Sequence, residues 1–191
     1  MKFFEKKSEN KANIDKDFEL LLQKFDLKEI SLNKNESDLY NIISGLVIIP
    51  LVQNKGDINN NTVVRLFSFF YLLGVIDGFC QSLNHPNSSF YKICIHFFLF
   101  DSQKNGYNYN QFAELFLERY NQILEFDLVK EIMKLGGEDV FSELNSIARN
   151  EKRLFPKIRL DNLISEWKEL KSQSLTSKQK ELLDYLNSQI L

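Results

Sequence analysis

Residues that interrupt regular structure are scarce in this 191-residue sequence, which contains 7 Gly and 3 Pro. A β-sandwich or β-barrel needs many tight turns, and Gly and Pro supply the backbone geometry of most such turns. The shortage therefore disfavours both all-β architectures and favours long helical segments.

Residues that most often carry chemistry are rare as well, since the chain has 2 His and 2 Cys. Their spacing matches no zinc-binding pattern. The Walker loop and the G-x-G-x-x-G, H-E-x-x-H and G-x-S-x-G motifs are all missing from the sequence. The sequence thus offers no catalytic residue, predicts no cofactor and weighs against an enzyme.

The two cysteines, Cys80 and Cys94, lie in apolar surroundings. Buried thiols in a chain that can build an adequate core are typical of a reducing compartment. A disulfide between them is geometrically feasible, but nothing in the sequence requires it.

No apolar run is long enough to cross a bilayer, which takes about 20 residues. The stretch 66–76 is about half that length and is bracketed by Arg65 and Asp77, and the stretch 39–52 contains Pro50. The N-terminal residues lack the apolar region of a secretory signal. We therefore expect a cytoplasmic protein without a membrane span. Export by a specialised secretion machine leaves no trace in composition.

An excess of positive charge is also missing, because 24 Lys and Arg face 26 Asp and Glu, for a net charge of −2. Proteins that bind a duplex usually carry a clustered basic face that neutralises phosphates. The basic pairs here, such as Lys152–Arg153, are short and flanked by acids. A nucleic-acid partner is therefore disfavoured. The heavy use of Asn, Lys, Ile and Phe is typical of an AT-rich genome, as in many bacteria.

Aromatic residues, in contrast, are plentiful, with 17 Phe and 7 Tyr in a chain that is 43% hydrophobic. Apolar residues recur every three to four positions, which is the period of a helix with one buried face. The segment 62–83 is apolar nearly all round, as a helix buried on most sides is. These patterns predict an all-α fold: a single irregular bundle of about seven or eight helices around a buried central helix, with a more polar C-terminal helical hairpin.

The same patterns divide the chain into three parts. Residues 1–13 are polar and Lys-rich and are expected to form a flexible arm, whereas residues 14–150 form the helical core domain. Residues 151–191 form an amphipathic hairpin that packs on the core or is offered to a partner.

Helix boundaries are predicted from capping and breaking residues. Ser37 is expected to cap a helix that stops or kinks before Pro50, with a short strand at 46–49 as the competing interpretation. The Asn-rich stretch 54–61 is expected to be a loop. Gly136 and Gly137 are expected to end one helix, after which Glu138 and Asp139 open the next and complement its dipole.

The segment 101–112 lies between two predicted helices and resembles an EF-hand calcium loop in its spacing. The positions that carry the resemblance are oxygen-bearing Asp101, Gln103 and Asn105, then Gly106 and the carbonyl of Tyr107. The segment departs from the family at its last position, where Phe112 replaces a bidentate Glu. The resemblance implies a degenerate, calcium-responsive helix pair, and the simpler interpretation is a turn in which Gly106 is left-handed.

Asp77 is unusual because it is a carboxylate in an otherwise apolar helix, where it must find a partner or shift its pKa. Gly74 and Gly78 flank it and allow another helix to approach closely. A structural hydrogen bond from a neighbouring helix is the favoured explanation. If an interior ligand pocket exists, Asp77 is its first candidate polar group, with His96 and Tyr71 beside it.

These observations rank three functions. The first is a non-enzymatic protein–protein interaction module, such as an adaptor, chaperone-like partner or inhibitor, whose partner is another protein. The residues expected to contact that partner are Trp167, Leu170, Leu183 and Leu186. The alternatives are a small-molecule-binding or enzymatic bundle around Asp77 and the calcium-responsive pair at 101–112. The oligomeric state is not predicted.

Overall fold

The computed structural model describes residues 31–101, 105, 106, 109, 115, 119, 121–150, 159–170 and 174–190. Every regular element in this part of the chain is helical, so the predicted all-α class and the number of helices are confirmed. The elements are α2 (Lys34–Gln53), α3 (Lys55–Asn60), α4 (Thr62–Ser82), α5 (Asn87–Cys94), the π-helix η1 (Ile95–Asp101), α8 (Asp127–Ala148), α9 (Leu160–Lys168) and α10 (Ser177–Ile190). The arm expected at 1–13 lies outside the described residues.

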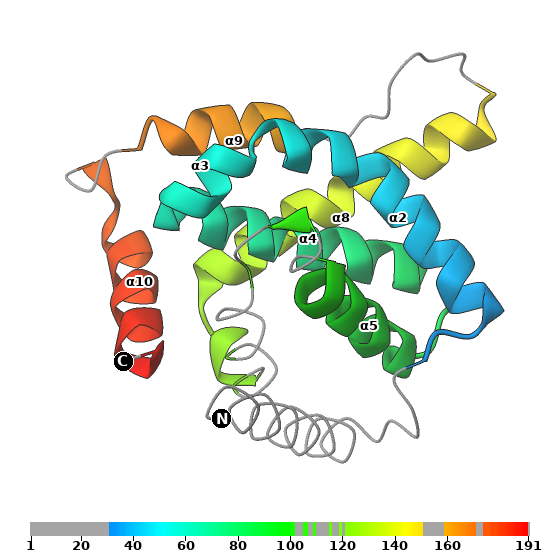
Figure 1. The fold of residues 1–191 in the computed structure, drawn as a ribbon, viewed down its shortest axis with the longest axis horizontal. Coiled ribbons are helices and arrows are strands. Elements are labelled where there is room, and N and C mark those ends of the chain that lie inside the picture. The colour runs from blue at the N-terminus through cyan, green and yellow to red at the C-terminus, as the bar shows by residue number, and fades with distance from the viewer. Residues whose placement is uncertain are drawn as a thin grey trace, which may run out of the picture.

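Helix α4 is the central helix of the bundle, as its sequence predicts. Figure 1 shows α2 and α9 on one side of it and α8 behind it, and these helices pack directly on α4. By length and by its mean hydropathy of 1.7, α4 could cross a membrane, but 78% of that apolar window is buried inside the protein. The other helices therefore give α4 the apolar surroundings that its composition requires.

Helix α2 begins earlier and ends later than the sequence predicts. Asn33, and not Ser37, is its N-cap: the Asn33 side chain accepts from the Glu36 amide at 3.0 Å, and the Glu36 carboxylate accepts from the Asn33 amide at 2.8 Å. This reciprocal capping box satisfies two amides at the helix start. The helix continues through Pro50 to Gln53, so it does not stop before the proline, and residues 46–49 are helical and not a strand.

The stretch 54–61, predicted as a loop, contains the short helix α3. Ile58 is fully buried and anchors this helix to the core. Asn54 joins α2 to the C-terminal region, because its side-chain amide donates to Pro50 O at 2.9 Å and to Asp161 Oδ1 at 2.7 Å. Burial of one apolar residue and these hydrogen bonds outweigh the low helix propensity of Asn and Gly.

Helix α8 is continuous through Gly136 and Gly137, so the predicted break at this pair is wrong. The reason is the contact with α4. A Cβ atom added at Gly74 would clash with the carbonyl oxygen of Met133, and one added at Gly136 would clash with the carbonyl oxygen of Tyr71. The glycines therefore allow the two backbones to touch, and this contact compensates for the weak helix propensity of glycine.

The C-terminal helices α9 and α10 attach to different parts of the bundle. Trp167 of α9 meets the rings of Phe67 and Tyr71 edge-on, with centroids 5.6 and 6.5 Å apart. Helix α10 packs on α8 and begins with a second capping box, in which Thr176 and Gln179 exchange hydrogen bonds of 2.8 and 3.3 Å.

Candidate functional site

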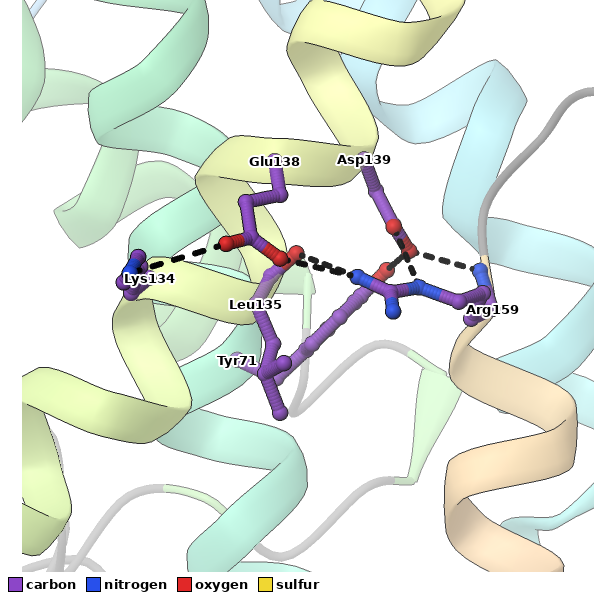
Figure 2. Close-up of polar contacts among 6 residues, drawn as sticks. All are labelled: Tyr71, Lys134, Leu135, Glu138, Asp139 and Arg159. Atoms are coloured by element: carbon purple, nitrogen blue, oxygen red, sulfur yellow. Dashed lines mark hydrogen bonds and ion pairs between the residues drawn. The ribbon is translucent and has the colours of Figure 1, made fainter.

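A buried carboxylate, Asp139, joins α4, α8 and the start of α9. Tyr71 Oη donates to Asp139 Oδ2 at 2.5 Å. Arg159 donates from Nε to Asp139 Oδ1 at 2.5 Å and from its backbone amide to Oδ2 at 2.8 Å. Figure 2 shows the Arg159 side chain reaching α8 from the beginning of α9, with the Tyr71 hydroxyl approaching the same carboxylate from α4. Both carboxylate oxygens are therefore hydrogen-bonded.

The charges in this cluster are balanced. Burial, and then the hydrogen bond to Asp139, raise the pKa of Tyr71 well above its usual range, so its hydroxyl remains a donor. Partial burial alone would lower the pKa of Arg159, but the hydrogen bond and charge of Asp139 outweigh it and raise that pKa. Because Tyr71 is 0% and Asp139 3% exposed, no substrate reaches them. The cluster is a structural tie between three helices.

Asp139 is the residue that sequence reasoning missed, because it was placed at the first turn of a separate helix. In the continuous α8 it follows Ile132 and Gly136 at helical spacing on the buried face. If one helix is assumed to continue through Gly136 and Gly137, the Asp139 carboxylate falls on its apolar face. The signal was thus present but was hidden by the assumption that two glycines end a helix.

An open groove of about 780 Å³ lies between α4 and α8. Its apolar lining comes from Leu124, Met133, Phe141 and Leu144. Phe141 is 65% exposed, which is high for a phenylalanine in a chain with a large aromatic core. The groove lies next to the glycine contact, where Gly78 and Gly137 face each other.

The polar groups of the groove include both signs of charge. Asp77 is half-buried and accepts a hydrogen bond of 2.7 Å from Gln81 Nε2 on the same helix, not from a neighbouring helix as predicted. Lys130 and Lys134 lie beside carboxylates of their own helix, with Lys130 Nζ 3.6 Å from Asp127 Oδ1 and Lys134 Nζ 3.8 Å from Glu138 Oε1. The lysines therefore already have counter-ions, whereas the hydrogen-bond donor to Asp77 is neutral.

The structure separates the three residues predicted to share an interior pocket. Asp77 lines the groove, while Tyr71 is bound to Asp139 in the core. His96 of η1 lies edge-on to Tyr40 of α2, with ring centroids 6.3 Å apart. Of these three residues, Asp77 lines the groove, whereas Tyr71 and His96 make their contacts elsewhere in the described part of the chain.

The predicted calcium loop is described only in part. Gln103 and Tyr107 lie outside the described residues, and Asp101 ends η1. Gly106 has φ 73°, which confirms the predicted left-handed conformation. A Cβ added there would lie 2.7 Å from Lys55 Nζ, so an ammonium group lies over the turn and disfavours a cation. Asn105 directly precedes this glycine in the chain.

The residues predicted to contact a partner are used largely inside the chain. Trp167 is 8% and Leu186 2% exposed, so these two side chains pack within the chain itself. Leu170 and Leu183 are half-buried and pack against the core. The amphipathic faces of α9 and α10 cover the bundle itself, because burying them there removes apolar surface from water.

The thiols of Cys80 and Cys94 are free and buried, in agreement with their apolar sequence context. Burial, and then the charge of Asp77, raise the pKa of Cys80 to about 12. Burial also raises the pKa of Cys94 well above its usual range. Both side chains are therefore thiols at neutral pH and poor nucleophiles.

Comparisons with protein-family models, curated proteins and solved structures find no match to this chain. The class of the protein is therefore given by its architecture, an all-α bundle with a buried central helix. Its function has to be argued from the surface, where the groove between α4 and α8 combines exposed apolar side chains with polar groups.

Proposed function

We propose that the protein is a non-enzymatic interaction module that binds a helix of another protein in the groove between α4 and α8. The observation that carries this proposal is Phe141, which leaves 65% of its surface in water at the edge of an apolar groove. An exposed aromatic ring beside a partly buried apolar groove is typical of interaction sites on soluble proteins. A groove between two helices suits the apolar face of a third helix.

The groove is better suited to binding than to catalysis. Among the described residues, its lining contains no imidazole and no thiol. Its two lysines are matched by carboxylates on α8, and Gln81 donates a hydrogen bond to Asp77. An apolar floor with a few polar groups is the usual make-up of a recognition site, in which the polar groups fix orientation.

A second apolar surface exists on α2, where Ile42, Ile49 and Val52 are about half exposed. These residues lie on the outer face of a single helix, so their surface is convex. A convex stripe offers a partner less area than a groove with two walls. The groove is therefore the stronger candidate for the main binding site.

Site-specific photocrosslinking tests the proposal in the cell that makes the protein. Phe141 is replaced by the crosslinker p-benzoylphenylalanine, and the matched control carries the same residue at Asn60, the exposed last residue of α3. We expect one predominant protein adduct from position 141 that is missing from position 60. Phe141→Ser should abolish co-purification of that same protein. Identical adduct patterns at both positions would contradict the proposal.

A further inference from the structure

We propose that the helix received by the groove carries a Lys or Arg among its apolar residues, and that Asp77 binds this cation and selects the partner. This inference rests on the proposed function, because it specifies what occupies the same groove. It starts from a charge that the groove does not compensate within the described residues. Asp77 is half-buried beside Gln81, whose amide is neutral.

Asp77 is distinguished from the other described charged groups of the groove because those groups are paired with opposite charges. Lys130 and Lys134 are matched by Asp127 and Glu138 on their own helix, at 3.6 and 3.8 Å. Glu138 has a second counter-ion, because Arg159 Nη2 lies 3.5 Å from its Oε2. A cation that enters the groove therefore finds one carboxylate without a cationic partner among the residues described, and that carboxylate is Asp77.

The position of Asp77 favours a side chain from a helix over a small ion. One carboxylate with an amide neighbour does not supply the oxygen ligands that a divalent cation needs. A lysine or arginine brings its charge on a long apolar stem, which can lie along Met133 and Phe141 while the charged end reaches Asp77. An acidic residue at the same place would meet a like charge that is partly shielded from water.

Burial decides how much this pair contributes. Exposed ion pairs add little to binding, whereas charged pairs that lose their water on binding are worth considerably more. Asp77 starts half-buried, and a helix laid over the groove would cover it further. We expect the pair to change affinity about tenfold, which lies between the exposed and the fully buried limits.

A displayed library of helical peptides, randomised along one face and selected on the full-length chain, tests this inference. Selected peptides are then synthesised, and their dissociation constants are measured by fluorescence anisotropy. We expect apolar residues at i, i+3 or i+4 and i+7 with one Lys or Arg between them. Replacing that base by norleucine should weaken binding about tenfold.

The matched protein variants are Asp77→Asn and Glu138→Gln, which remove the same charge from two places in the groove. Asp77→Asn should weaken the basic peptides about tenfold and leave the norleucine peptides unchanged, whereas Glu138→Gln should change either by less than about twofold. The norleucine exchange tests the same pair on unmodified protein, so the result does not depend on how well Asp77→Asn folds.

The outcomes separate this inference from the proposed function. If the selected peptides bind in a Phe141-dependent way but show no preference for a base, Asp77 does not select the partner and the groove remains a binding site. Equal effects of Asp77→Asn and Glu138→Gln lead to the same conclusion. If no selected peptide is weakened by Phe141→Ser, the proposed groove itself is wrong, and the inference is wrong with it.

Discussion

The α4–α8 pair has a closed side and an open side, and each contains one aspartate from the middle of a helix. On the closed side Asp139 accepts hydrogen bonds from Tyr71 and from two nitrogens of Arg159. On the open side Asp77 accepts one from Gln81 and borders the groove. The difference arises because the start of α9 covers Asp139, whereas no described helix lies over Asp77.

The comparison indicates which polar group is structural. A buried charge is retained in a core only when it is paired and hydrogen-bonded, so Asp139 is explained by the contacts it makes. Asp77 makes fewer contacts than its position in an apolar helix calls for. This difference supports the proposal that a bound partner supplies a further contact to Asp77.

The largest expected effect comes from removing Asp139, and removal of Asp77 serves as the matched control. Asp139→Ala leaves the buried Tyr71 hydroxyl and the Arg159 backbone amide without their acceptor, at about 1–3 kcal/mol for each group, and should lower the free energy of unfolding by about 3–5 kcal/mol. Asp77→Ala, the matched control, should change it by less than about 1 kcal/mol because it loses one half-exposed hydrogen bond. Urea unfolding followed by circular dichroism measures both. Similar losses of unfolding free energy in the two variants would contradict the distinction between the closed side and the open side.

The glycine contact between the two helices can be tested next. Gly74→Ala brings a methyl group against the backbone of Met133, which no side-chain rotation can relieve, and should cost about 3 kcal/mol. Gly45→Ala on α2 is the control, since an added Cβ there has no atom within 4 Å. It should stabilise the protein by up to about 1 kcal/mol through helix propensity. Thermal unfolding of both variants distinguishes close packing from propensity.

A second buried acid, Glu36, extends the comparison to pH. Burial would raise its pKa, but hydrogen bonds from Asn33 and Ser89 and the charge of Lys92 outweigh it, so the pKa lies below 4.5. A lowered pKa stabilises the fold above the unfolded value, and this stabilisation is lost as pH falls through the folded value. Glu36→Gln should cost about 1–2 kcal/mol at pH 7.

Melting temperatures measured from pH 7 to pH 3 test this expectation. The wild-type protein should lose stability below about pH 4.5, and the difference from Glu36→Gln should shrink over the same interval. A difference that stays constant down to pH 3 would mean that the Glu36 charge does not contribute to stability.

The smallest effect is expected on the open side. Phe141→Ser should change the free energy of unfolding by less than about 0.5 kcal/mol, because the ring is largely in water already. Phe79→Ser, in the buried face of α4, is the contrast and should cost several kcal/mol, at least about 3. A large loss from Phe141→Ser would place its ring in the folding core instead of at a binding surface.

Periodicity sufficed to predict the fold class and the central helix, because a helix such as α4 that is apolar on all sides has to be buried on most of them. Boundaries were less accurate where contacts distant in sequence decide them. Burial of Ile58 stabilises a helix in the Asn-rich stretch 54–61. The close contact with Gly74 allows α8 to remain helical at Gly136. Neither effect can be read from local propensity.

The sequence pointed to one residue of the candidate site, Asp77, but not to Phe141. Asp77 was identified because a charge in an apolar helix stands out whatever the boundaries are. The exposure of Phe141 depends on how α8 crosses α4, which the sequence does not give. Trp167 and Leu186 were expected at a partner surface because amphipathic helices look the same whether they cover their own bundle or another protein.

Burial of both native thiols has a practical consequence. Cys80, with its pKa of about 12, and Cys94 form little thiolate at neutral pH, and neither is accessible to a reagent in the folded chain. A single cysteine introduced at an exposed position, such as Asn145 in the groove, can thus be labelled selectively without first removing the native pair. A fluorophore at that position would report on occupancy of the groove in an otherwise unmodified protein.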